Sequence, residues 1–248
     1  MGRRRVITVA TPLLLASRAA DEFATSASIA LRERKRFAIA LSGGKTPRAM
    51  LETLSARALG WPAIEFFWSD ERCVGPDDPF SNYRMAREAL LSRIAVPAGN
   101  VHRMLGELEP AAGAAAYDSE LRAFFGPRKP AFDLVFLGLG PDGHTASLFP
   151  GTAALDITDI WCAPNEVREP VASPWRLTLT YPAINAARRV IFVVEGAEKA
   201  DILATVLGRE KDVRRYPAQG IAPTDGELVW LVDSAAAAKL PSSLLTHE

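Results

Sequence analysis

The sequence predicts an α/β fold: a doubly wound, mostly parallel sheet with helices on both faces and a small antiparallel portion at one edge. Short, fully apolar runs alternate with longer segments of helical periodicity, and this alternation is typical of a parallel sheet covered on both faces. The chain has 248 residues, of which 48% are hydrophobic and 23% charged, as in ordinary globular proteins. We expect one domain spanning residues 1–248.

The expected elements follow from this alternation in chain order. Strands are predicted at residues 6–10, 37–41, 64–68, 132–139, 176–181, 189–194 and 227–232. One long helix is predicted directly after the first strand, and others at residues 47–58, 82–94, 111–125 and 197–207. The segment 157–182 is rich in proline and polar residues, which favours antiparallel strands at an edge of the sheet.

The first thirty residues resemble a signal peptide, but a strand followed by a long helix explains them better. Three arginines precede an apolar stretch, which Thr8, Thr11 and Pro12 interrupt. An apolar residue then recurs every fourth position, at Leu15, Ala19, Phe23, Ala27 and Leu31, as on one face of a helix. No run reaches the roughly 18–20 apolar residues of a transmembrane helix. We therefore expect a cytoplasmic protein without a membrane partner.

Charge and residue counts exclude several classes of protein. The 29 Lys and Arg residues balance the 29 Asp and Glu residues, whereas a nucleic-acid-binding protein normally has a basic excess. Nucleic acid is therefore not an expected partner, although a local basic pocket for a small anion is compatible with this balance. Two cysteines make no disulfide framework, and three dispersed histidines argue against a metal site.

A glycine-rich turn, Leu41-Ser-Gly-Gly-Lys-Thr-Pro47, follows the strand at 37–41. Its glycines allow the backbone to approach a ligand, and free N–H groups at the start of the next helix would bind an anion such as phosphate. We expect Thr46 to cap that helix and Pro47 to begin it. A nucleotide P-loop would need glycine at Ile39. The candidate phosphate-binding residues are Ser42, Gly43, Gly44, Lys45 and Thr46; a plain strand–turn–helix corner is the alternative.

Polar residues also follow the strand at 64–68, in the run Ser69-Asp-Glu-Arg-Cys73. Asp70 and Arg72 belong either to a solvated loop or to a polar site, and the residues alone leave both readings open. Ser81, a little further on, is expected to cap the helix at 82–94.

The segment 138–151 places glycines, an aspartate and a histidine where a strand is expected to lead into a helix. Gly138, Gly140 and Gly143 match the spacing of a dinucleotide-binding fingerprint. The helix would end after about two turns at Phe149-Pro-Gly151, which argues against that function.

The same residues fit a catalytic role better than dinucleotide binding. With an unperturbed pKa near 6.5, His144 can act as a general base at neutral pH. Asp142 would orient His144 or contact the substrate, and the N–H groups of the expected helix start would stabilise an oxyanion. The alternative is an incidental loop histidine. Because no Gly-x-Ser-x-Gly elbow is present, a hydrolase of this sequence would activate water rather than form a serine acyl-enzyme.

Two further cations complete the candidate residues. Lys199 is expected in the first turn of the helix at 197–207, where a cation opposes the helix dipole and hints at a bound anion. A solvated surface lysine is the alternative. Arg176 begins the strand at 176–181.

Taken together, these motifs resemble the glucosamine-6-phosphate isomerase/6-phosphogluconolactonase family, in order and along nearly the whole chain. The segments that carry the resemblance are 42–47, 69–72, 81–82, 138–151, 176–180, 196–199, 216–218 and 230–233. The resemblance implies a fold like the sugar-phosphate isomerases, no required cofactor, and hydrolysis of 6-phospho-D-glucono-1,5-lactone in the oxidative pentose phosphate pathway. The implied partner is this small lactone, and we expect a monomer.

The resemblance also implies roles for individual residues. His144 becomes the general base on water, and Asp142 and Arg72 are similar to active-site residues of the family. Residues 42–46, Asp70, Arg176 and Lys199 look like phosphate or substrate binders. Many members carry serine or threonine where this chain has Lys45, and the stretch 173–175 before Arg176 departs from the more basic or proline-rich pattern of other members.

Two other functions compete with lactone hydrolysis. One is the reaction of a glucosamine-6-phosphate isomerase/deaminase, a mechanism that resembles one using a further acid shortly after the histidine. This chain has Ser147, Leu148 and Phe149 in that region, so no acid is available there. A non-catalytic sugar-phosphate sensor would need the phosphate loop but no base, and the presence of His144 beside Asp142 argues against it.

Overall fold

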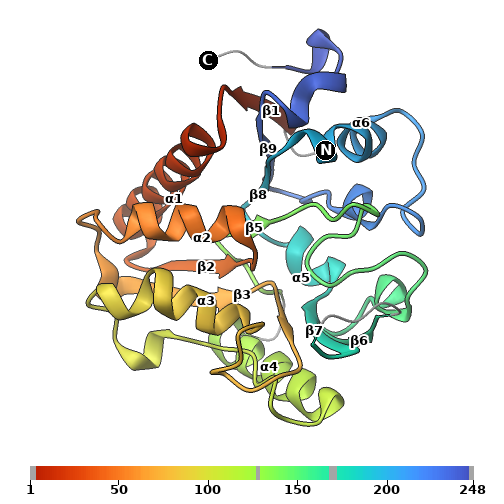
Figure 1. The fold of residues 1–248 in the computed structure, drawn as a ribbon. Helices are drawn as coiled ribbons and strands as arrows, with labels where there is room; N and C mark the ends of the chain where they lie inside the picture. Colours follow the sequence, from red (N-terminus) through yellow and green to blue (C-terminus); the bar gives the residue numbers. More distant parts are fainter. Residues whose placement is uncertain (1–3, 127–128, 168–171, 246–248) are drawn as a thin grey trace.

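The computed structural model describes residues 4–126, 129–167 and 172–245 (Figure 1). Its main sheet has six strands in the order β1-β9-β8-β5-β2-β3, and every neighbouring pair is parallel. The strands are β1 (Arg4–Val9), β2 (Phe37–Leu41), β3 (Ile64–Trp68), β5 (Leu134–Leu137), β8 (Arg189–Val194) and β9 (Glu227–Asp233). The parallel sheet expected from the apolar runs is therefore confirmed.

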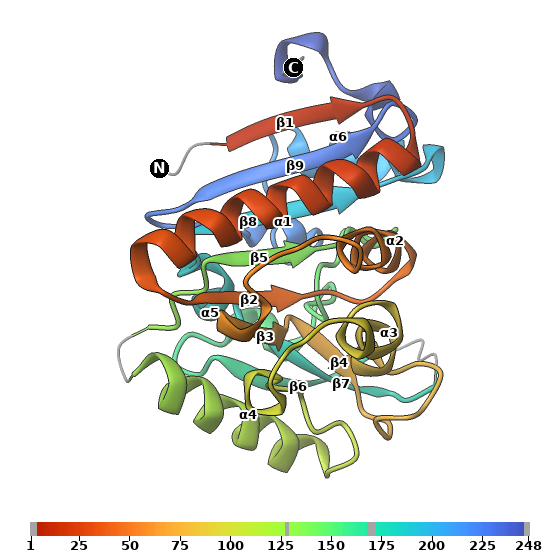
Figure 2. The same ribbon diagram turned by 90° about the vertical axis from the view of Figure 1, so that its left-hand side faces the viewer.

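Helices cover both faces of this sheet, as predicted. Figure 2 shows α1 (Pro12–Arg34) and α2 (Lys45–Leu54) on one face, and Figure 1 shows α5 (Tyr181–Asn185) and α6 (Ala200–Leu207) on the other. The helix α3 (Asn82–Ala89) packs beside α2. The amphipathic spacing of α1 buries Phe23 against the rings of Phe37 and Phe66. No helix within the described ranges is both long and apolar enough to cross a membrane.

A second, antiparallel sheet has the strand order β4-β7-β6, formed by β4 (Asp70–Arg72), β7 (Trp175–Leu179) and β6 (Cys162–Glu166). The helix α4 (Pro110–Phe125) packs on β6 and β7. This confirms antiparallel strands within residues 157–182. Ser69 joins the two sheets, because its N–H donates to Leu41 O (2.7 Å) and its carbonyl accepts from Leu179 N (2.8 Å).

The helix expected within residues 138–151 is absent, and that prediction is wrong. Backbone bonds fold the segment back on itself instead: Gly140 N donates to His144 O (2.9 Å), and Leu148 N donates to Thr145 O (2.9 Å). Ala146 adopts φ +48°, a left-handed conformation that no regular helix accommodates. Turn chemistry therefore prevails over helix propensity in this glycine-rich segment.

Two helix starts also differ from expectation. Gly44, with φ +112°, occupies the N-cap of α2, so that Thr46 lies inside the first turn rather than at the cap. Lys199 ends a 3₁₀ turn, Ala197–Lys199, which leads directly into α6. The expected cap of α3 is confirmed, because Ser81 Oγ accepts a hydrogen bond from Arg84 N (3.1 Å).

Candidate active site

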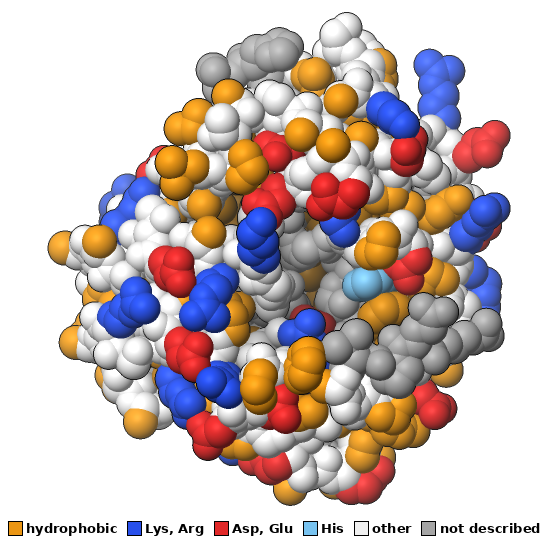
Figure 3. Space-filling view, viewed as in Figure 1, with side chains coloured by type: hydrophobic (Ala, Val, Ile, Leu, Met, Phe, Trp, Pro, Cys, Tyr) orange, Lys and Arg blue, Asp and Glu red, His pale blue; other side chains and the backbone are white. Residues whose placement is uncertain are grey.

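A cavity of about 270 Å³ lies at the carboxyl ends of β2, β5 and β8. Parallel strands end at the same edge of a sheet, so the loops that follow them meet there. Figure 3 shows this face hollowed, with a histidine and several Lys or Arg side chains around the hollow. The lining residues are Ser42, Gly43, Asp70, Arg72, Asn82, Gly138, Leu139, Gly140, Pro141, His144, Ala146 and Lys199.

The His144 imidazole is held from behind by Asp142. Its Nδ1 lies 2.6 Å from Asp142 Oδ1, and the same oxygen accepts the His144 backbone N–H (3.0 Å). Burial raises the pKa of Asp142, but these contacts with His144 outweigh burial and hold the pKa below its ordinary value. An ionised Asp142 keeps the proton of His144 on Nδ1, and Nε2 has no hydrogen-bond partner among the described residues.

Two neighbours determine where the imidazole lies. Its ring is 4.1 Å, centroid to centroid, from the ring of Phe149. Gly140 is the second neighbour, and a methyl group added there would overlap the His144 ring. Glycine at position 140 therefore makes room for the histidine, a packing requirement unrelated to dinucleotide binding.

Arg72 lines the cavity and is hydrogen-bonded to Asn82, which lines it too. The Arg72 guanidinium donates to Asn82 Oδ1, and Asn82 Nδ2 donates to the backbone oxygen of Asp70 (2.8 Å). Asp70 Oδ2 accepts a hydrogen bond from Ser147 Oγ (2.7 Å). Asp70 is buried and yet lines the cavity. Among the two readings left open by sequence, the structure supports a polar site rather than a solvated loop for Asp70 and Arg72.

Glu71, between these two residues, does not line the cavity and instead binds the start of α3. Its carboxylate accepts hydrogen bonds from Asn82 N (2.7 Å), Tyr83 N (2.8 Å) and Ser81 Oγ (3.0 Å). Burial raises the pKa of Glu71, although the backbone hydrogen bonds oppose that effect. Glu71 thus anchors the start of α3, which positions Asn82 beside Arg72.

The glycine-rich turn is divided between two cavities. Ser42 and Gly43 line the cavity that contains His144, and a methyl group at Gly43 would overlap the Asn82 amide. Gly44 and Lys45 line an adjoining cavity of about 500 Å³. Thr46 is buried in the first turn of α2 and lines neither of these two cavities.

The two remaining candidate cations differ in placement. Lys199 lines the cavity, and its ammonium has no hydrogen bond or ion pair to the described residues. Arg176 does not line it: Arg176 Nη1 donates to Trp175 O (2.9 Å) and to Ser173 O. Burial, followed by the charge of Arg72, which is its partner across β4 and β7, lowers the pKa of Arg176.

Sequence reasoning missed Asn82 and Ser147. Asn82 follows the capping Ser81, so its position in the motif at 81–82 was the available signal, but its link to Arg72 depends on tertiary contacts. Ser147 was considered only as a replacement for an acid, whereas its hydroxyl is engaged by Asp70. No group of three or more His, Cys, Asp or Glu side chains gathers around a possible metal position in the part of the chain that the structure describes.

Comparisons with known proteins show the family of this chain. The family model of glucosamine-6-phosphate isomerases/6-phosphogluconolactonase matches residues 10–230. A 6-phosphogluconolactonase of Nostoc sp. is 46% identical over 231 residues, which are 91% of this chain and 94% of the relative.

Solved structures show the same fold. The 6-phosphogluconolactonase from Trypanosoma brucei superposes with a TM-score of 0.87 at 30% identity, covering 97% of this chain and 100% of that one. A monomeric glucosamine-6-phosphate deaminase superposes with a TM-score of 0.81 over 95% of this chain and 99% of that one, at 19% identity, a likeness of fold alone. The chain belongs to the glucosamine-6-phosphate isomerase/6-phosphogluconolactonase family.

Proposed function

We propose that this chain hydrolyses 6-phosphogluconolactone to 6-phosphogluconate in the oxidative pentose phosphate pathway. The observation that carries the proposal is the pair of His144 and Asp142. It offers an unengaged Nε2 to a cavity that also presents Arg72, Lys199 and the glycine-rich turn. The similarity to 6-phosphogluconolactonases along more than nine tenths of the chain supports the same function.

In the proposed reaction, His144 is the general base. Asp142 retains the Nδ1 proton of His144 in a hydrogen bond, and the Nε2 lone pair takes a proton from water. The water oxygen bonds to the carbonyl carbon of the lactone, whose carbonyl oxygen becomes an oxyanion. The bond from that carbon to the ring oxygen then breaks, and the ring oxygen receives the proton from Nε2. The resulting acid loses its own proton to solvent, and His144 ends the cycle neutral.

Cationic groups around the cavity suit the two anionic groups of this reaction, the phosphate and the oxyanion. Arg72 is proposed to stabilise the oxyanion or to hold the substrate, and preorganised donors of this kind need no reorganisation during the reaction. Lys199, together with Ser42 and Gly43, which line the same cavity, is proposed to bind the phosphate group. Lys45 and Arg176 would contribute only long-range positive potential, because neither lines this cavity.

The test follows the disappearance of freshly generated 6-phosphogluconolactone at a pH where spontaneous hydrolysis is slow. The wild-type chain is expected to accelerate it, and His144→Ala to reduce kcat roughly 10²–10⁴-fold, the usual contribution of general-base catalysis. His102→Gln is the matched control, because His102 lies outside the cavity. A wild-type rate equal to that of buffer would refute the function, and an unchanged rate in His144→Ala would refute the assigned base.

Substrate comparisons separate the competing functions. The unphosphorylated lactone should be a much poorer substrate than the phosphorylated one if the glycine-rich turn and Lys199 bind phosphate. Glucosamine-6-phosphate should not be deaminated, because Ser147 replaces an acid after the histidine and its hydroxyl is engaged by Asp70. We further propose that the enzyme is a cytoplasmic monomer. Size-exclusion chromatography with light scattering tests the oligomeric state.

A further inference from the structure

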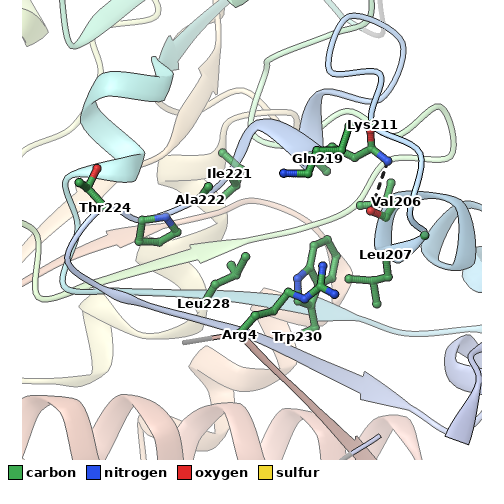
Figure 4. A pocket seen from close by; sticks show the side chains of 13 residues that line it. Arg4, Val206, Leu207, Lys211, Gln219, Ile221, Ala222, Thr224, Leu228 and Trp230 are labelled. Carbon is green, nitrogen blue, oxygen red and sulfur yellow. Dashed lines mark hydrogen bonds between the residues drawn. The ribbon is translucent and has the colours of Figure 1, made fainter. Parts of the chain in front are cut away.

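A second cavity, of about 460 Å³, lies on the face of the sheet that carries α6 and shares no lining residue with the cavity at His144. Its volume is within the range of about 300–1,000 Å³ typical of small-molecule sites. Figure 4 shows Leu228, Arg4 and Trp230 on the side of the sheet, with Gln219 and Ile221 opposite and Leu207 near the end of α6.

The walls of this cavity are apolar and preformed. Leu207 and Ile221 are each 3% exposed, and Trp230 stacks flat on Phe192 at a centroid distance of 3.8 Å. The Gln219 amide braces the opposite wall: Nε2 donates to Glu210 O (2.9 Å) and to Val206 O (3.3 Å), and Oε1 accepts from Asp212 N (2.7 Å). A wall with its polar groups already satisfied can receive an apolar ligand without losing hydrogen bonds.

Both charged residues that line the cavity are cations. Arg4 and Lys211 are exposed, and neither forms an ion pair with a described residue. The Trp230 indole N–H is buried and has no acceptor in the part of the chain that the structure describes, but it is too enclosed to reach a ligand. The preference of the cavity for an anion therefore rests on Arg4 and Lys211.

We propose that this cavity is a binding site for a flat aromatic anion, separate from the catalytic cavity. The ring of such a ligand lies against the apolar walls beside Trp230, and its acidic group is held by Arg4 and Lys211 at the rim. Apolar burial supplies most of the affinity and the two cations supply the preference for negative charge. The proposal does not depend on the lactonase activity.

The test is a fluorescence titration with 1-anilinonaphthalene-8-sulfonate, an aromatic anion with a flat naphthalene ring. We expect one saturable site on the native chain. Ala222→Trp, a change at an exposed lining residue, should fill the cavity and weaken binding about tenfold or more. Lys211→Gln should weaken binding roughly 2–5-fold, as removal of one exposed charge pair does, and the difference should shrink in high salt.

Two control variants locate the probe. Arg93→Gln removes an exposed cation that lines no cavity described above, and Lys199→Gln removes a cation of the catalytic cavity; both should bind the probe as the wild type does. Near-ultraviolet circular dichroism should show all four variants folded. Unchanged binding in Ala222→Trp, loss of binding in Lys199→Gln, or equal affinity for the uncharged N-phenyl-1-naphthylamine would each overturn the proposal.

Discussion

Glycine at position 140 leaves the space that the His144 imidazole occupies. A methyl group there would overlap the imidazole, whereas Phe149 supports the ring from another side and Asp142 binds its Nδ1. The histidine is therefore held by packing and one hydrogen bond, and small displacements of its ring would move Nε2 relative to the substrate.

Gly140→Ala is accordingly expected to lower kcat for lactone hydrolysis about tenfold or more, because a misplaced base costs rate even when the chain folds. The matched control is Gly99→Ala, where an added methyl group meets no atom within 4 Å. Steady-state kinetics of both variants check the prediction. Equal kcat for Gly140→Ala and the wild type would show that the imidazole adapts to the methyl group.

At the scale of elements, α4 fastens the antiparallel sheet to the main one through Tyr117. This fully buried phenol accepts a hydrogen bond from the backbone N–H of Trp68 (2.9 Å), at the end of β3. Trp68 lies directly before Ser69, the residue that joins the two sheets.

Tyr117→Phe should therefore lower the free energy of unfolding by about 1–3 kcal/mol, the cost of leaving a buried donor without a partner. Tyr216→Phe is the control, because the Tyr216 hydroxyl forms no hydrogen bond with a described residue, and its effect should stay within about 0.5 kcal/mol. Urea denaturation measures both values. A loss in Tyr117→Phe no greater than in the control would contradict the assigned role.

A second tie between elements depends on pH. His102 stacks on Phe67 of β3 and places Nδ1 2.7 Å from Glu120 Oε1 of α4 and Nε2 3.1 Å from Glu65 Oε2 of β3. Burial lowers the pKa of His102, but hydrogen bonds to Glu120 and Glu65 outweigh burial and raise the pKa above its ordinary 6.5.

Because its folded-state pKa is raised, His102 contributes stability that is fully present below pH 6.5 and is lost as pH rises through the folded-state pKa. His102→Gln should therefore reduce the free energy of unfolding more at about pH 5.5 than at about pH 8.5. Urea denaturation of both proteins across this range checks the sign. A difference in unfolding free energy between the wild type and His102→Gln that grows with pH would contradict a charged His102 held between Glu65 and Glu120.

At the scale of the whole molecule, the two sheets share their connections. The chain passes from β3 to β4 and returns from β7 through α5 to β8, and Ser69 is hydrogen-bonded to strands of both sheets. Asp70 of β4 also binds Ser147, which lies in the turn after β5. Separating the two sheets would break the backbone bonds of Ser69 and the hydrogen bond between Asp70 and Ser147.

We therefore expect the two sheets to unfold together. Tryptophan fluorescence and far-ultraviolet circular dichroism should report the same urea midpoint, since Trp230 lies in the main sheet and Trp175 in the antiparallel one. Two separated midpoints would show that the antiparallel sheet and α4 unfold independently and would also contradict the expectation of one domain.

The local sequence pattern predicts an element well where a single interaction, such as burial of an apolar strand, dominates. Strands β2 and β5 of the main sheet are buried on both faces, so they read as continuous apolar runs. Polar segments are harder to predict from the sequence. Residues 70–72 read as part of a polar loop or site, yet they form a strand that pairs with β7. The buried Glu71 carboxylate is accommodated there because it accepts hydrogen bonds from the start of α3. A helix is expected at His144 because strands of an α/β sheet usually lead into helices, and neither the turn hydrogen bonds nor the left-handed Ala146 has a signal in the sequence that would exclude it.

The sequence by itself determined the parallel fold, the position of Asp142 and His144 directly after β5, and the glycine-rich turn after β2, because each shows in residues that are neighbours in the chain. Only the tertiary structure decided which candidates meet. It brings Lys199 and Arg72 to the cavity of His144, directs Arg176 elsewhere and recruits Asn82. The physical reason is the sheet order β8-β5-β2-β3, which gathers strand ends that are distant in the chain.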